Sequence, residues 1–333
     1  MTTVKKNGTV YQNGHLIKAD VLIDGQKIKA IGTDLEGEET IDASGMIVSP
    51  GLVDVHVHYR DPGQTYKEDI KTGSQAAARG GFTTVGAMPN VTPVPNTAEL
   101  MEKMVRENQK KGLVHILQYG PVTKDETTDI IPDYAELKKA GAFALSNDGH
   151  GVQSAQTMYL AMQKAKENNL IIAVHAQDDS LFNKGIVNEG VAAEKLDLPP
   201  VTELAETTQI ARDLLLAQKT RVHYHICHVS TKTSVELVRL AKARGIKVTC
   251  EVAPHHILLT DSDIPEDDPY FKMNPPLRSK EDQAALLVGL LDGTIDLIAT
   301  DHAPHAKAEK QGSMREAAFG ITGSETAFST LYT

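Results

Sequence analysis

Two histidines separated by one residue follow an apolar run in the first fifth of the chain and could bind a metal ion. The run LVDVHVHYR covers residues 52–60 and ends in His56, His58 and Arg60. Because side chains alternate between the two faces of a strand, these three would lie on the same face. Two imidazoles on one face can bind a divalent cation, and an arginine beside them can bind an anion. Alone, the H-x-H pattern is a weak signal, because a structural role fits it about equally well.

Further imidazoles and carboxylates stand where later apolar runs end. Each has an ordinary interpretation by itself, since an aspartate before a glycine, for example, commonly belongs to a turn. Together they predict one site, because the carboxyl ends of barrel strands meet at one mouth. Nitrogen and carboxylate ligands without thiolate suit Zn2+ or a similar ion, and six groups fit two metals that share a bridging ligand. The six candidates are His56, His58, Asp148, His175, His228 and Asp301.

The elements that would position these groups alternate between strands and helices. Apolar runs typical of buried parallel strands cover residues 52–58, 82–88, 113–119, 142–145, 170–175, 222–228, 246–251 and 295–300. Helical patterns cover residues 67–79, 98–109, 155–168, 202–218, 234–243 and 280–291. Such repeats predict an α/β fold with a (β/α)8 barrel of the TIM type over residues 51–333. The alternative, an open doubly wound sheet, is less favoured because no G-x-G-x-x-G motif follows the first strand.

The first fifty residues follow a different pattern. Short strand-like pieces at residues 8–11, 19–23, 28–31 and 46–48 are separated by turn residues such as Asn13-Gly14 and Asp24-Gly25. This pattern predicts a small antiparallel, β-sandwich-like domain over residues 1–50.

The composition excludes several classes of protein. A chain of 333 residues with 41% hydrophobic content can bury a large core. Its formal net charge of −10 argues against nucleic acid or an anionic membrane as the partner. The two cysteines, Cys227 and Cys250, form no disulfide framework or zinc motif. We find no signal peptide and no transmembrane run, and therefore expect a cytoplasmic protein.

Two histidines near His228, namely His223 and His225, are assigned structural roles. Strict alternation along residues 222–228 would place His228 on the opposite face from His223, His225 and Cys227. We therefore expect these last three to pack against the helices.

Several motifs resemble those of bacterial type I dihydroorotases, which belong to the amidohydrolase superfamily. The resemblance covers essentially the whole chain, and its motifs are jointly very specific, although H-x-H alone is shared by many amidohydrolases. The motifs are PGLVDVHVHYRDPG (50–63), GGFTT (80–84), MPN (88–90), HICHVST (225–231), NPPLR (274–278) and DHAPH (301–305). The resemblance implies reversible ring opening of dihydroorotate to N-carbamoyl-L-aspartate, a step of de novo pyrimidine (UMP) synthesis.

The resemblance also assigns residues to the chemistry. It implies two zinc ions per chain, one held by His56, His58 and Asp301, the other by His175 and His228, and both bridged by Asp148 and a hydroxide. Asp301 would accept the proton of this hydroxide and deliver it to the departing ring nitrogen. The implied substrate-binding residues are His58, Arg60, Asn90, Asn274, His305, Phe319 and Gly320, the last two through their backbone. Arg60, Asn90 and His305 would bind the substrate carboxylate.

Some features depart from the wider family. Residues 142–148 contain no lysine that could be carboxylated to bridge two metals, so Asp148 must bridge, as in the type I members. Asn147 stands where family members often carry a second aspartate. Family members also continue past residue 333, so we expect the last helix to be truncated and the small domain to be incomplete without a C-terminal extension.

Other functions are weighed against this one. A hydantoinase or allantoinase would use the same barrel, but Arg60, Asn90 and His305 favour a substrate that carries a carboxylate. A metallo-phosphotriesterase fits less well for the same reason, and a non-catalytic scaffold would usually have lost ligands. A homodimer and an association with aspartate transcarbamoylase are left open. The polar stretch 306–314 predicts either a mobile loop over the site or a solvated linker.

Overall fold

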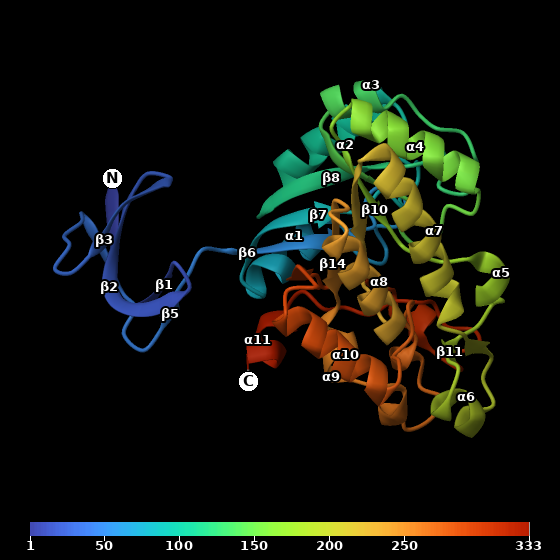
Figure 1. Ribbon diagram of the computed structural model, residues 1–333. Helices are drawn as coiled ribbons and strands as arrows, with labels where there is room; N and C mark the ends of the chain where they lie inside the picture. The colour runs from blue at the N-terminus through green and yellow to red at the C-terminus, as the bar shows by residue number, and fades with distance from the viewer. Residues whose placement is uncertain (333) are drawn as a thin grey trace. The chain divides into compact units, whose positions relative to one another are not determined.

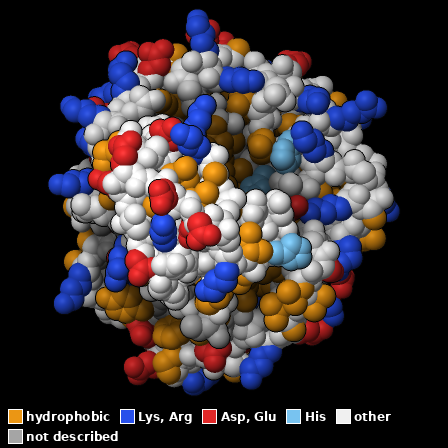
Figure 2. All heavy atoms as spheres, turned by 90° about the vertical axis from the view of Figure 1, so that its left-hand side faces the viewer, with side chains coloured by type: hydrophobic (Ala, Val, Ile, Leu, Met, Phe, Trp, Pro, Cys, Tyr) orange, Lys and Arg blue, Asp and Glu red, His pale blue; other side chains and the backbone are white. Residues whose placement is uncertain are grey.

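The computed structural model describes residues 1–332, which fall into two compact units. The first unit is Met1–Leu52 and the second begins at Val53 (Figure 1). None of the helices in residues 1–332 combines the length and the apolar character needed to cross a membrane. Figure 2 shows Asp and Glu side chains interspersed among Lys and Arg side chains.

The first unit is one five-stranded sheet. Its strands are β1 (Thr2–Gln12), β2 (His15–Asp24), β3 (Lys27–Gly32), β4 (Glu39–Asp42) and β5 (Ile47–Val48). The order is β3-β2-β1-β4, with β5 also paired to β1. We expected an antiparallel unit, but β4 and β5 pair parallel to β1. The reason is the segment between β3 and β4, which is too long for a hairpin turn. The carboxylate of the buried Asp20 fixes this segment by accepting a hydrogen bond from the Leu35 N–H at 3.2 Å.

The second unit is built on an eight-stranded parallel barrel, which confirms the predicted fold. Its strands, in sheet order, are β6 (Leu52–Val57), β7 (Phe82–Ala87), β8 (His115–Pro121), β9 (Ala142–Ser146), β10 (Ile171–Val174), β13 (His223–Ile226), β14 (Val248–Val252) and β15 (Leu297–Ile298). Every pair from β7 to β15 is parallel.

The barrel closes between β6 and the residues that follow β15. Side-chain hydrogen bonds and a parallel β-bridge between Val57 and His302 make this closure. Strand β15 has two residues, whereas the sequence predicted a strand over 295–300. The carboxylate of Asp54 in β6 takes the place of main-chain hydrogen bonds to this short strand. It accepts hydrogen bonds from the Thr300 N–H at 3.0 Å and from the Thr300 hydroxyl at 2.5 Å. The His58 N–H then donates to the His302 carbonyl at 2.9 Å. This closure brings residues 301–305 beside the end of β6.

The helices lie outside the strands (Figure 1). The main ones are α1 (Ile70–Arg79), α2 (Ala98–Lys111), α4 (Ala155–Glu167), α7 (Leu204–Thr220), α8 (Lys232–Ala243) and α10 (Lys280–Leu291), all within three residues of the predicted limits. Side-chain oxygens cap several first turns: Thr97, Ser154 and Ser279 each accept an N–H three residues ahead. Between strands and helices lies the main core, which includes Ile172 and Ile226.

Several short elements were not predicted. They are α3 (Tyr134–Lys139), α5 (Asp179–Phe182), β11 (Val187–Asn188), α6 (Val191–Leu196), β12 (Pro200–Val201), α9 (Pro254–Leu258), η1 (Asp261–Asp263), η2 (Pro269–Phe271), η3 (Lys307–Lys310) and α11 (Ala327–Tyr332). Residues in and next to these elements form a second apolar cluster that includes Val187, Leu198, Met273 and Met314. Met314 is fully buried, so the stretch 306–314 is not a fully solvated linker. Its movement over the site stays a prediction.

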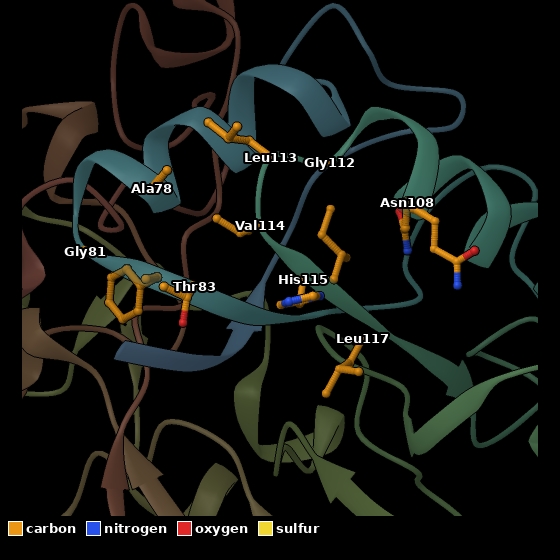
Figure 3. Close-up of a pocket in the computed structure, with 12 residues that line it drawn as sticks. Ala78, Gly81, Thr83, Asn108, Gly112, Leu113, Val114, His115 and Leu117 are labelled. Carbon is orange, nitrogen blue, oxygen red and sulfur yellow. The ribbon is translucent and has the colours of Figure 1, made fainter. Parts of the chain in front are cut away.

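A hollow of about 760 Å3 opens near the first residues of β7 and β8 (Figure 3). Its lining includes Phe82, Leu113 and Leu117, and His115 is its only titratable side chain. The hollow therefore lies away from the carboxyl ends of the strands and offers no set of groups for acid–base or metal chemistry.

Candidate metal centre and active site

The six predicted ligands meet at the carboxyl ends of the barrel strands, and all are buried. Their ligand atoms form two groups, and within each group they lie within 4.8 Å of one another. The first group is His56, His58 and Asp301; the second is Asp148, His175 and His228. His56 lies in strand β6 and His58 directly follows it, and the others follow β9, β10, β13 and β15.

Asp148 lies between the two groups. Its Oδ1 is 3.3 Å from His56 Nε2 and 3.5 Å from His228 Nε2. Its Oδ2 is 3.3 Å from His58 Nε2. One carboxylate therefore contacts histidines of both groups, which is the position that a bridging ligand needs.

Two buried atoms of this cluster are left without hydrogen bonds. His56 Nε2 and Asp148 Oδ1 have no hydrogen-bond partner among the described residues, although they lie 3.3 Å apart. Buried polar atoms nearly always have a partner, so two adjacent exceptions need an explanation. A divalent cation between imidazole and carboxylate donors supplies one, and the residues present fit such an ion.

The protonation states of Asp148, Asp301 and His175 suit ligation. At His56 and His228 burial would lower the pKa, but the neighbouring carboxylates outweigh it and raise the pKa, so a metal ion would displace a proton from these two rings. Burial alone would raise the pKa of Asp148, but His56 and the other imidazoles outweigh it and hold this pKa well below its usual range. The same balance lowers the pKa of Asp301. Burial, and then the neighbouring His228, lower the pKa of His175 to about 4. Near neutral pH the acids are therefore ionised and His175 is neutral, as metal binding requires.

Left-handed backbone conformations orient three of the site residues. The φ angles are 55° at Arg60, 31° at His228 and 50° at Asp301. Residues other than glycine rarely adopt such angles, and they are strained there. Strain at three residues of one site indicates that the surrounding structure holds them in place for function.

The predicted faces of β13 were wrong, and the backbone at His228 explains why. Tyr224 packs on the helix side, where its hydroxyl donates to Asp213 of α7 at 3.1 Å. Cys227 lies in the small cluster inside the barrel, and His225 bonds to Glu251 near the metal ligands. His228 departs from strand alternation because its left-handed φ turns its side chain toward the site.

Glu251 of β14 was missed by the sequence analysis. Its carboxylate accepts a hydrogen bond from His56 Nδ1 at 2.6 Å and lies 3.0 Å from His225 Nε2. This contact fixes the His56 tautomer and leaves Nε2 free for a metal. A signal was present, because Glu251 is a charged residue at the end of the predicted buried strand 246–251.

We expect Glu251→Gln to weaken metal binding by about 10- to 100-fold, because the amide holds His56 less firmly and lowers its basicity. Competition against a chromophoric chelator measures the affinity. Glu236→Gln, on the exposed face of α8, is the matched control and should bind metal like the wild type. Wild-type affinity in the Glu251 variant would show that this contact does not support ligation.

A pocket of about 200 Å3 opens above the two ligand groups. It is lined by His58, Arg60, Asn90, Asp148, Gly149, His175, Asn274, Asp301, Ala303, His305, Phe319 and Gly320. All the predicted substrate-binding residues are in this set.

Arg60 is the side chain of this pocket best suited to an anion. It is 8% exposed, and its Nε donates to the Pro304 carbonyl at 3.3 Å. Within residues 1–332 its two terminal nitrogens have no hydrogen-bond acceptor. A buried guanidinium with two free nitrogens can bind a carboxylate through two parallel hydrogen bonds.

The other predicted substrate residues are partly engaged by the protein. Asn90 Oδ1 lies 2.9 Å from His58 Nδ1, and its amide donates to the Asp148 carbonyl at 3.3 Å. Asn274 donates to Gln177 at 2.7 Å, beside His175. Both amides therefore contact predicted metal ligands as well as line the pocket.

His305 is held at both ring nitrogens. Its Nε2 donates to the Phe319 carbonyl at 2.7 Å, and Lys67 Nζ lies 3.4 Å from its Nδ1. Burial, and then the Arg60 guanidinium, lower its pKa to about 4, so the ring is neutral near neutral pH. The sequence analysis did not single out Lys67.

Asn147 belongs to the scaffold. Its Oδ1 accepts the N–H groups of Val122 and Thr123 at 2.8 and 3.0 Å, and its amide donates to the Glu126 carbonyl at 2.9 Å. A side chain that both donates and accepts is needed here, which suits asparagine better than aspartate.

The fold and the site define a metal-dependent hydrolase of the amidohydrolase type. Among solved structures, the chain is similar to the L-hydantoinase (dihydropyrimidinase) from Arthrobacter aurescens, with a TM-score of 0.87 and 26% identity over 99% of this chain and 76% of that one. A D-hydantoinase structure gives a TM-score of 0.85 at 27% identity and covers 100% of this chain and 76% of the other.

Sequence comparisons identify the family of the chain. A dihydro-orotase-like family model matches residues 45–234. Dihydroorotases of Lactobacillus johnsonii and Lactobacillus gasseri are 96% and 90% identical over 333 residues, covering 100% of this chain and 78% of each relative. That of Ligilactobacillus salivarius is 61% identical and is covered to 79%. The chain belongs to the dihydroorotase family, whose members hydrolyse cyclic amides.

Proposed function

We propose that this protein is a dihydroorotase, which interconverts dihydroorotate and N-carbamoyl-L-aspartate in pyrimidine synthesis. The observation that carries the proposal is the shared pocket, where two groups of metal-type ligands face the free guanidinium nitrogens of Arg60. Dihydroorotate has the two matching features, a ring amide to be cleaved and a carboxylate to be held. The 96% identity to the Lactobacillus johnsonii dihydroorotase supports the same substrate.

The ligand set fits two zinc ions. His56, His58 and Asp301 would hold one ion, His175 and His228 the other, and Asp148 would bridge them. When bound, the ions would lower the pKa of water so that it can act as a nucleophile near neutral pH, and would polarise the amide carbonyl.

The chain's own groups then position the substrate and move the proton. The Arg60 fork would fix the substrate carboxylate and so set the ring amide over the ligand groups. Asp301 directs its Oδ1 to His58 Nε2, at 3.1 Å. Its Oδ2 would accept the proton of the attacking water and pass it to the ring nitrogen as the C–N bond breaks.

The direct test measures zinc per chain together with turnover of dihydroorotate and of unsubstituted hydantoin. We expect close to two ions per chain and turnover of dihydroorotate only, because hydantoin has no carboxylate for Arg60. A fully metallated protein that hydrolysed hydantoin and left dihydroorotate unchanged would overturn the proposal in favour of a hydantoinase.

Replacing Arg60 by Gln should raise KM for dihydroorotate by about 10- to 100-fold, since hydrogen bonds to charged groups contribute about 1.5–3 kcal/mol. Zinc content should stay at the wild-type level, because Arg60 is not among the ligands. Arg106→Gln, on the exposed surface of α2, controls for the loss of a positive charge. An unchanged KM in the Arg60 variant would mean that another group binds the carboxylate.

A further inference from the structure

Four consecutive carbonyls beside the pocket all accept hydrogen bonds from side chains. Those of Ala317, Ala318, Phe319 and Gly320 accept from Lys272 Nζ at 2.6 Å, Lys310 Nζ at 3.0 Å, His305 Nε2 at 2.7 Å and Lys310 Nζ at 3.0 Å, respectively. We call these residues the 317–320 segment. This run is not part of a helix or sheet, and side chains supply the donors for all four of its carbonyls.

Lys310 makes the largest contribution to this arrangement. Its ammonium also donates to the Lys272 carbonyl at 3.1 Å, so each of its three N–H groups has an acceptor. The side chain is 6% exposed, and no carboxylate in the described part of the chain forms an ion pair with it. Three carbonyl dipoles therefore hold a buried charge.

The surroundings of Lys310 make this charge costly. Burial, and then the nearby Lys272, lower the pKa of Lys310 to about 8, while Asp268 opposes the shift. Lys272 itself lies over the Phe319 ring at 4.3 Å. Burying a charged lysine costs free energy, so the carbonyl geometry that Lys310 imposes is expected to serve a function.

The backbone N–H groups of the 317–320 segment indicate this function. The N–H groups of Ala317, Ala318 and Gly320 have main-chain acceptors, namely the carbonyls of Ser313, Glu309 and Lys272. For the Phe319 N–H, residues 1–332 provide no acceptor. Phe319 and Gly320 also line the pocket.

We propose that Lys310 is a positioning residue for substrate binding: by holding the carbonyls of Ala318 and Gly320, its ammonium presents the main chain at Phe319 to the substrate. Lys310 does not line the pocket and acts only through this segment. The inference rests on the proposed function, because it concerns how the same pocket binds dihydroorotate.

The test compares the kinetics of three variants. Lys310→Met keeps the aliphatic stem and removes the three donors, and it should raise KM by about fivefold while kcat changes less than threefold, since one neutral hydrogen bond contributes about 1 kcal/mol. Lys310→Arg retains a charge and should recover part of the loss. Lys307→Met, on the exposed side of the same 3-10 helix, should match the wild type.

The pH profile separates positioning from a general loss of stability. In the wild type, KM should rise above about pH 8, as Lys310 loses a proton and with it one donor. This rise should be absent from Lys310→Met, whose KM is already high, and from Lys310→Arg, which stays charged. A variant that was merely less stable would lose kcat and folded protein without altering the pH dependence of KM.

The outcomes distinguish this inference from the proposed function. An active wild type together with an unchanged KM in Lys310→Met overturns the role of Lys310 alone. A metallated wild type that left dihydroorotate intact would overturn the proposed function instead. In that case hydrogen–deuterium exchange over residues 315–322 decides the remaining point: faster exchange in Lys310→Met than in Lys307→Met supports the ordering of the segment by Lys310, and equal exchange contradicts it.

Discussion

Replacing Asp148 by Ala is expected to remove bound zinc and to reduce turnover of dihydroorotate by about 10³-fold or more. The Asp148 carboxylate lies between the two ligand groups and contacts imidazole nitrogens of both. Its loss leaves four imidazoles and Asp301 without the bridge that would keep two cations close together. Metal ions contribute several kcal/mol to such reactions, and about 4 kcal/mol corresponds to 10³-fold.

Metal analysis of the purified variant and its steady-state rate with added zinc measure the two effects. Asp125→Ala, an exposed site in the loop after β8, is the matched control and should retain both metal and activity. The Asp148 variant should remain folded, because this side chain caps no helix and carries no scaffold contact comparable to that of Asn147. Two zinc ions per chain in the variant would show that Asp148 is not the bridge.

The fold and the ligand set were accessible from the sequence for one reason. Parallel strands and their helices have regular hydrophobic patterns, and the barrel then brings all carboxyl ends of strands to one mouth. His56 and His175 continue the alternation of their strands, so their direction follows from the strand itself. The limits of α4 and α10 are also local, since Ser154 and Ser279 cap them.

The other features of the site could not be predicted, because they depend on backbone conformations and on contacts between distant residues that no sequence pattern encodes. His228 reaches the site through a left-handed φ of 31°, and strict alternation therefore assigned His225 to the wrong side. Glu251 acts on a histidine 195 positions away in the chain. Lys310 looked like part of a polar loop, because only the folded chain shows that three carbonyls surround it.

Asp301→Asn separates proton transfer from metal binding. Asp301 has one carboxylate oxygen near both histidines of its group, with Oδ1 at 3.1 Å from His58 Nε2 and 3.5 Å from His56 Nε2. The asparagine oxygen can keep this position, so the variant should retain most of its zinc. The amide nitrogen that replaces Oδ2 cannot accept a proton. We therefore expect kcat to fall by about 10²- to 10⁴-fold, the range for loss of a general acid–base group.

KM for dihydroorotate should change little in this variant, because Arg60 and the 317–320 segment remain in place. A kcat loss with an unchanged KM marks an interaction that is used only in the transition state. Kinetics in both directions at saturating zinc, with zinc content measured on the same samples, give the comparison. If restoring full zinc occupancy returned kcat to the wild-type value, Asp301 would be a ligand only, and the proton would have to pass through another group of the pocket.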